Sequence, residues 1–180
     1  IDFGAKVVET RLMVFLDYNS APFIIGYFLN SVALGYYSLA FKVYLTVFNL
    51  LIQATQTVAK SVFPRIQDEL RRLRPLYYRA VGTLSLVVCP ICLGIAATAP
   101  ELIRVLLGDG WLDAVPAIRL LMYTAVLITA VSYNGPILIA LGRPSWLLSL
   151  VSLRTVTGIL MSCAVVHWGI VWVAASFFVA

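Results

Sequence analysis

The sequence consists largely of uncharged apolar segments, each long enough to cross a lipid bilayer. Long segments without Asp, Glu, Lys or Arg include residues 80–100, 120–142 and 155–180. A membrane-spanning helix needs about 20 consecutive apolar residues. Of the 180 residues, 62% are hydrophobic and only 12% are charged, so nearly every face of every helix must be apolar. This pattern predicts an integral membrane protein with an all-α fold.

We expect a polytopic bundle of about five and a half transmembrane helices that occupies the whole chain, residues 1–180. The predicted helices cover residues 4–28, 33–63, 76–107, 114–141 and 146–166, with an incomplete sixth over 170–180. The connections are short and contain Gly, Pro, Asn or Asp, which predicts antiparallel neighbours. Because the chain begins with Ile1 and stops within an apolar run, we expect it to be part of a longer protein.

Basic residues gather between the second and third predicted helices. They are Arg65, Arg71, Arg72, Arg74 and Arg79. Lys and Arg in short loops stay on the cytoplasmic side, so this connection is expected to be cytoplasmic. The net charge of +5 is therefore a topology signal. Nucleic acid is not an expected partner, because arginines beside a transmembrane helix normally orient it or contact anionic lipids.

Polar residues of the second predicted helix recur at every third or fourth position. They are Ser38, Lys42, Thr46, Asn49, Gln53, Gln56 and Lys60. At about 100° per residue they form one polar stripe along the helix. Amides and a lysine are costly against lipid, so the stripe must face protein or a water-filled cavity. It could join helices by hydrogen bonds or line a substrate path, and its length favours a path.

Four charged residues lie well inside predicted helices. Asp17 and Lys42 both lie about 15 Å from the outer surface in antiparallel neighbours, which predicts an ion pair between them. That pair could be structural or could serve gating or ion coupling. Arg11 and Arg154 lie inside the first and fifth predicted helices. They could contact an anion in a lumen or pair with Glu9 or another buried acid.

The sequence contains no pattern typical of a catalytic or metal site. Cys89 and Cys92 match C-x-x-C, but they lie in an apolar crossing, which indicates packing. His167 is the only histidine, so a metal site would have no second imidazole. Phosphate-binding glycine loops are also absent. We expect a protein that is not an enzyme and has no cofactor.

Two further groups are interpreted as structural. Arg119 lies near an outer helix end, where its side chain would extend towards the membrane surface. Proline occurs inside the predicted helices, where it produces kinks or hinges. These prolines are Pro22, Pro90, Pro100 and Pro136.

Several segments together resemble one family of membrane proteins. They are Phe23–Leu29, Ala33–Ala40, Val62–Gln67, Leu107–Trp111 with Ala114–Pro116, Ala140–Pro144 and Trp168–Ala174. In their order and spacing they resemble the polysaccharide exporters and flippases of the MOP superfamily, and most closely the subgroup typified by the colanic acid exporter. The chain departs from the family pattern at Asn30, where Gly is common, and at Ser20-Ala21-Pro22, where the family has an acidic residue.

The resemblance implies a transporter of two six-helix bundles, of which this chain is most of the second, C-terminal one. It implies a protein of the bacterial inner (plasma) membrane that moves undecaprenyl-pyrophosphate-linked oligosaccharide outward by alternating access. The implied partners are the lipid-linked substrate, membrane lipids, the first bundle and polysaccharide polymerase or assembly proteins. Lys42, Arg11 and Arg154 could contact the pyrophosphate, and Thr46, Asn49, Gln53 and Gln56 the sugar.

Two other functions stay open from the sequence. A MOP relative could carry another cargo, such as a peptidoglycan precursor or a small molecule. A polytopic glycan ligase or polymerase belongs to a different class and normally carries acidic or histidine groups in a large outer loop. The outer loops here offer little beyond Glu101, Asp109 and Asp113, which disfavours the enzyme.

Overall fold

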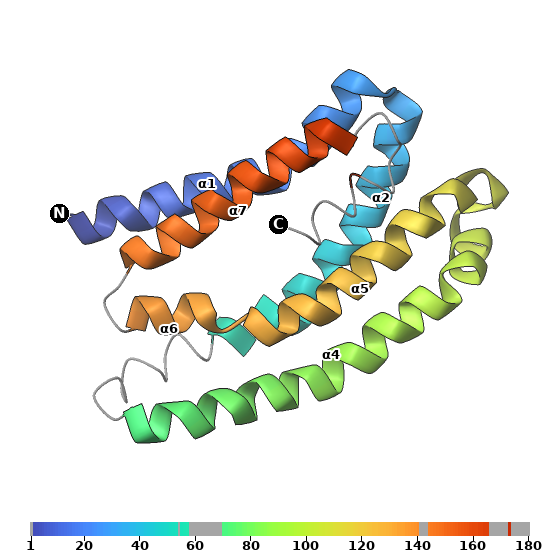
Figure 1. Cartoon of the computed structure of the whole chain (residues 1–180). Coiled ribbons are helices and arrows are strands. Elements are labelled where there is room, and N and C mark those ends of the chain that lie inside the picture. The colour runs from blue at the N-terminus through green and yellow to red at the C-terminus, as the bar shows by residue number, and fades with distance from the viewer. Residues whose placement is uncertain (1, 54, 58–69, 141–143, 166–172, 174–180) are drawn as a thin grey trace.

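The computed structural model describes residues 2–53, 55–57, 70–140, 144–165 and 173. Every regular element within these ranges is a helix (Figure 1). The elements are α1 (Asp2–Phe28), α2 (Ser31–Val47), the π-helix η1 (Phe48–Gln53), α4 (Leu70–Leu107), the 3-10 helix η3 (Asp109–Ala114), α5 (Val115–Val131), α6 (Asn134–Ala140) and α7 (Pro144–Val165). This confirms the predicted all-α fold.

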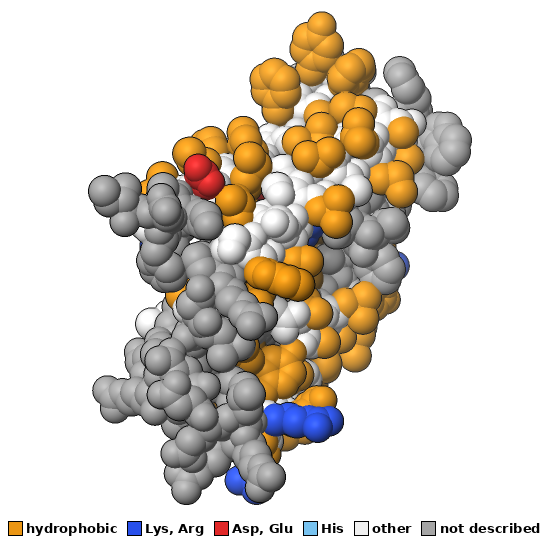
Figure 2. Space-filling model, turned by 60° about the vertical axis from the view of Figure 1, so that its left-hand side comes forward, with side chains coloured by type: hydrophobic (Ala, Val, Ile, Leu, Met, Phe, Trp, Pro, Cys, Tyr) orange, Lys and Arg blue, Asp and Glu red, His pale blue; other side chains and the backbone are white. Residues whose placement is uncertain are grey.

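The described part contains four segments that are long and apolar enough to cross a membrane. They are Ser31–Thr57, Arg74–Leu107, Asp109–Ile139 and Ser145–Val165. Hydrophobic side chains cover much of the described surface on the face shown in Figure 2, and charged ones are few there. Helix α1 has 27 residues but also carries charges, including Arg11 and Asp17. The fold is therefore a multi-pass membrane bundle, as the sequence predicts.

The helices pack in a row rather than in chain order. Helix α1 lies beside α7, and the two run in the same direction (Figure 1). Helix α2 packs on α5, and α5 packs on α4. The short helix α6 packs on α7. Helices that are adjacent in the bundle, such as α1 and α7, can thus be far apart in the sequence.

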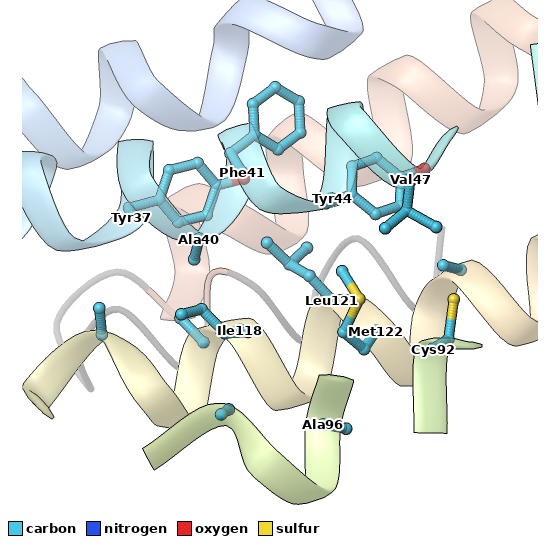
Figure 3. Packing of buried hydrophobic residues seen from close by; sticks show 14 of the residues in the cluster. Tyr37, Ala40, Phe41, Tyr44, Val47, Cys92, Ala96, Ile118, Leu121 and Met122 are labelled. Atoms are coloured by element: carbon cyan, nitrogen blue, oxygen red, sulfur yellow. The ribbon is translucent and has the colours of Figure 1, made fainter. Parts of the chain in front are cut away.

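The described core forms where α5 is packed between α2 and α4 (Figure 3). Helix α2 contributes Tyr37, Phe41 and Tyr44, and α5 contributes Leu121 and Met122. Small residues of α4, including Cys92 and Ala96, complete this cluster. Cys92 is fully buried, as expected for a packing residue.

Helix α2 starts two residues before its predicted start. The side chain of Asn30 accepts a hydrogen bond from the backbone N–H of Ala33 at 2.7 Å. Asn30 is thus the N-cap, and its side chain satisfies one of the N–H groups that a helix start leaves unpaired. Glycine has no side chain and could not make that bond.

The third predicted helix also starts earlier than expected. Helix α4 begins at Leu70, so Arg71, Arg72, Arg74 and Arg79 lie in the helix and not in the preceding connection. Arginine has a high helix propensity, which allows a basic first turn. Arg65, Lys60 and His167 lie outside the described residues, as do parts of the predicted helices 33–63, 146–166 and 170–180.

The predicted helix 114–141 is the largest departure. The 3-10 helix η3 precedes α5, and a turn at Ser132 and Tyr133 separates α5 from α6. Pro136 lies two residues into α6. Its ring removes the N–H that would continue the α5 hydrogen-bond ladder, which gives one reason for the break.

Gly108 closes α4 and should tolerate no side chain without strain. Its φ is 87° and its ψ is 174°, which is a conformation almost confined to glycine. Replacing Gly108 by alanine should lower the free energy of unfolding by about 1–2 kcal/mol. Gly110 is the matched control, because a Cβ atom added there would also meet open space, but Gly110 has no positive φ. Thermal unfolding of the two variants in detergent should therefore differ, and equal midpoints would contradict this account.

Candidate functional site: an ion pair and the polar stripe of α2

An ion pair joins α1 and α7 inside the bundle. The Asp17 Oδ2 and Arg154 Nη2 atoms are 3.4 Å apart. The two helices run side by side in the same direction (Figure 1), and the contact between these atoms places Asp17 and Arg154 at one depth in the bundle.

The structure gives Asp17 a different partner from the one predicted. Lys42 is exposed and forms no ion pair with another described residue. The Asp17–Lys42 pair was predicted because the two residues lie at similar depths in neighbouring helices. Lys42, however, lies on the side of α2 away from the core. Arg154 was expected to pair with an anion, and Asp17 is that anionic partner.

Aromatic rings of α2 lie close to this pair. Tyr18, the residue after Asp17, packs on Phe41 with ring centroids 5.9 Å apart. Phe41 in turn stacks on Tyr37 at 5.8 Å and on Tyr44 at 5.7 Å. Aromatic rings thus lie near the Asp17 side of the pair, and the Asp17 side chain is much less exposed than that of Arg154.

Two buried hydroxyl groups occur in the same region. Tyr37 is fully buried, and its hydroxyl has no hydrogen-bond partner among the described residues. The same is true of the Thr155 hydroxyl, next to Arg154 in the chain. A buried polar atom without a partner is costly and usually marks a functional constraint or a bound group. These hydroxyls and the ion pair are polar groups that the described interior brings to the region of α1, α2 and α7.

The polar stripe of α2 faces away from the described core. Lys42, Thr46, Asn49 and Gln53 are all exposed. The Thr46 hydroxyl bonds to the Lys42 carbonyl of its own helix at 2.9 Å. These four side chains therefore do not hold the described helices together by hydrogen bonds, which disfavours the structural interpretation for this part of the stripe.

A π-helix interrupts α2 within the stripe. The buried face continues through Tyr44 and Val47 and then advances five residues to Ile52. This five-residue step matches the i to i+5 bonding of η1, which contains Asn49 and Gln53. Single π turns inside α-helices are often found at functional sites. A uniform turn of 100° per residue could not predict this change in register.

Gln56 departs from the rest of the stripe. Its Nε2 donates to the Ser132 carbonyl at the end of α5, with 2.6 Å between the two atoms. This contact is an interhelical hydrogen bond of the kind that the structural interpretation predicted. The stripe thus divides into an exposed part and one residue that joins two segments.

Arg119 also bonds within the bundle instead of only extending towards the membrane surface. Its Nε donates to the Ala96 carbonyl of α4 at 3.0 Å. That carbonyl lacks its usual helical partner, because the residue four positions later is Pro100, which has no N–H. Gln56 has the same role, because the Ser132 carbonyl that it bonds lies four residues before Pro136. Each side chain thus replaces a backbone N–H that a proline lacks.

Arg11 and Glu9 are exposed on α1, and neither forms an ion pair with another described residue. The described residues include no group of three His, Cys, Asp or Glu side chains able to hold a metal ion. What the described site can do chemically is to bind anions and sugars through cations, amides and hydroxyls.

Sequence reasoning missed the aromatic face of α2 and the hydroxyls beside the ion pair. Tyr37, Phe41, Tyr44 and Phe48 recur at intervals of four, three and four residues, a spacing that could have identified them. Phe48 stacks on Tyr44 at 6.0 Å, which completes the row. No comparable signal marks Thr155.

Membrane-crossing helices that enclose an ion pair and present a polar stripe define a multi-pass membrane protein with a polar face inside the bilayer. The chain belongs to the polysaccharide biosynthesis protein family, whose model matches residues 1–116. It is thus a multi-pass protein of the bacterial inner (plasma) membrane associated with polysaccharide biosynthesis.

Curated relatives agree with this assignment. The chain is 32% identical to the teichuronic acid biosynthesis protein TuaB of Bacillus subtilis over 78% of its length and 29% of the relative. It is 23% identical to the lipopolysaccharide biosynthesis protein WzxC of Escherichia coli over 78% of its length and 29% of that protein. An uncharacterized membrane protein of the cps region of Klebsiella pneumoniae is also 23% identical. The match thus spans less than a third of each of these relatives, and no solved structure matches the chain.

Proposed function

We propose that the full-length protein flips an oligosaccharide linked to undecaprenyl pyrophosphate across the inner membrane for surface polysaccharide synthesis. The observation that carries this proposal is the exposed polar stripe on a membrane-crossing helix of a polysaccharide biosynthesis protein. Exposed amides and a lysine inside a bilayer need a water-filled or protein surface opposite them. In this proposal the chain is the C-terminal bundle, and the first bundle of the same protein faces the stripe.

The proposed substrate path uses cations for the pyrophosphate and amides for the sugar. Lys42 is exposed and without an ion-pair partner among the described residues, so its charge is available to a phosphate. Arg11 is equally exposed. Thr46, Asn49 and Gln53 would contact the sugar. Gln56 would offer its side-chain oxygen and one N–H, because its nitrogen donates the other N–H to Ser132.

In this proposal the Asp17–Arg154 pair serves gating or ion coupling. Asp17 reduces the charge that Arg154 can present to a phosphate, which distinguishes Arg154 from Lys42. The 3.4 Å contact occupies one end of the guanidinium group. Arg154 could therefore exchange Asp17 for a substrate phosphate while the two bundles rock between inward and outward states. Such transport needs no covalent chemistry and no cofactor, so the proposed protein is not an enzyme.

The test is the sidedness of the lipid-linked oligosaccharide in cells depleted of the full-length protein. Finished intermediate should accumulate on the cytoplasmic leaflet, and surface polysaccharide should be lost. Polymerase and assembly proteins, the proposed partners, would then lack substrate. If a peptidoglycan precursor accumulated instead, the cargo would be different. If the glycan reached the outer leaflet but stayed unjoined or unextended, the protein would be a ligase or polymerase, and the proposal would fail.

A further inference from the structure

The break between α5 and α6 lies inside a segment long enough to cross the membrane. The segment Asp109–Ile139 is apolar throughout most of its length, yet its helix is interrupted by the turn at Ser132 and Tyr133. Backbone groups freed inside a bilayer must find partners within the protein, because lipid supplies none. Two side chains, Gln56 and Tyr77, supply such partners at this break.

Gln56 supplies the first. In a continuous helix the Ser132 carbonyl would accept a bond from the backbone N–H of residue 136, and Pro136 has none. The Gln56 amide donates to that carbonyl at 2.6 Å. Gln56 follows the π-helix η1 at the end of α2, so the contact ties α2 to the point where α5 stops.

Tyr77 of α4 supplies the second. Its hydroxyl lies 3.1 Å from the Ala130 carbonyl of α5 and 3.1 Å from the Asn134 Oδ1 of α6. A hydroxyl carries one proton and can donate to only one of these oxygens at a time. Tyr77 thus has one acceptor on each side of the break, and exchange between them requires little movement of its ring.

The break separates two groups of packed helices. Helix α6 packs on α7, and α7 packs on α1. On the other side, α5 packs on α4 and α2. Figure 1 shows the α1 and α7 pair apart from α4 and α5, with α6 beside the break. The two groups also meet where α1 packs on α2, through the non-helical connection at Leu29 and Asn30 and through the rings of Tyr18 and Phe41.

We propose that Ser132 and Tyr133 form a hinge about which α6, α7 and α1 move as one unit relative to α2, α4 and α5, with Gln56 and Tyr77 holding the hinge in the conformation described here. Gln56 and Tyr77 are positioning residues, because they act on the backbone at the break. The proposal does not depend on the nature of the transported molecule.

Pro100 provides an internal comparison. There too a side chain, Arg119, donates to the carbonyl four residues before a proline, but α4 continues through Leu107. A helix proline with a substitute donor is therefore not sufficient for a break. At Pro136 the second contact, from Tyr77, spans both sides of the interruption, and the helices on either side pack on different neighbours.

The first test is a double-mutant cycle on the full-length protein in detergent micelles. Gln56→Leu should lower the thermal midpoint, because it leaves the Ser132 carbonyl unpaired. Pro136→Ala restores a backbone N–H for that carbonyl, so Gln56→Leu should cause no loss in the Pro136→Ala background. An equal loss of midpoint in both backgrounds would overturn the role of Gln56.

The second test measures the motion itself. Spin labels at Leu127→Cys in α5 and Leu150→Cys in α7 report across the break, and both positions are exposed. The native cysteines, including Cys89, Cys92 and Cys163, are replaced first. In lipid bilayers this pair should give a broad or double distance distribution that narrows in Pro136→Ala and shifts in Tyr77→Phe.

The control pair for that experiment lies within one group of helices. Labels at Leu127→Cys and Leu86→Cys, on α5 and α4, should give one narrow distribution that neither variant changes. A distribution across the break as narrow as that of the control pair, and unaltered in both variants, would overturn the hinge. These distances are measured without transport, so their outcome is separate from that of the proposed function.

Discussion

Replacing Arg154 by leucine should lower the free energy of unfolding of the full-length protein by about 2 kcal/mol. The substitution would leave the Asp17 carboxylate, whose side chain is 13% exposed, without its partner. Removing one member of a fully buried pair typically costs about 3–5 kcal/mol. The expected loss is smaller because the Arg154 side chain is 38% exposed and water or lipid headgroups can reach it. Thermal or chemical unfolding in detergent micelles measures the loss.

The controls for this prediction use a second ion pair and a double substitution. Arg104 contacts Asp109 at 2.8 Å, but both side chains are more than half exposed. Arg104→Leu should therefore cost less than about 1 kcal/mol. Replacing Asp17 and Arg154 together by leucine should recover most of the stability, because no charge then stays unpaired. If Arg154→Leu were as mild as Arg104→Leu, the pair would have no part in stability.

Lys42→Gln should reduce export of the lipid-linked oligosaccharide by about tenfold or more, while the amount of folded protein stays the same. A phosphate would lose a charge-assisted hydrogen bond, which is stronger than a neutral one. The fold should tolerate the change, because Lys42 is exposed and lies outside the core cluster. Export is measured as surface polysaccharide formed in cells that lack the native protein, relative to the protein level.

Two further variants decide how the Lys42 result is interpreted. Lys42→Arg keeps the positive charge and should retain most of the export. Gln53→Leu removes one amide of the stripe and should reduce export without lowering the protein level. Loss of folded protein in Lys42→Gln would indicate that the stripe is structural, and unchanged export in all three variants would remove it from the substrate path.

The sequence predicts the helical nature of the chain well because the constraint is simple. A bilayer requires about 20 apolar residues per crossing, and the chain repeats that pattern. The boundaries are less predictable, as α4 shows. The residues before position 76 include several arginines, and we assigned these charged residues to a loop. The predicted helix therefore began at residue 76, whereas α4 includes residues from Leu70 onwards. The capping role of Asn30 was equally hidden until the α2 start was known.

The candidate site could be predicted only in part, and Asp17 shows why. Depth along a helix follows from residue counting, and residue counting paired Asp17 with Lys42, which is not the partner that the structure gives it. Which helix lies beside α1 does not follow from depth. The partner comes from α7, a parallel helix far along the chain, and not from the sequential neighbour α2. Packing contacts between distant segments decide this, and one sequence does not display them.

The breaks in helix geometry were the least predictable features. Pro136 indicates a kink or hinge, but it does not reveal that Gln56 would donate to Ser132. At a turn of 100° per residue, Gln53 and Gln56 are both predicted to lie on the polar stripe. The π-helix Phe48–Gln53 changes the register of the helix, and the two amides therefore have different surroundings.

The parallel arrangement of α1 and α7 has a consequence for how the protein is made. Asp17 and Arg154 are separated by 137 positions in the chain. At about 5–20 residues per second, a ribosome needs about 7–27 s to synthesise that stretch. During this interval α1 has left the ribosome while the helix that neutralises its carboxylate does not yet exist. Chains interrupted before α7 would therefore keep the Asp17 carboxyl group of α1 without the partner that it has in the complete bundle.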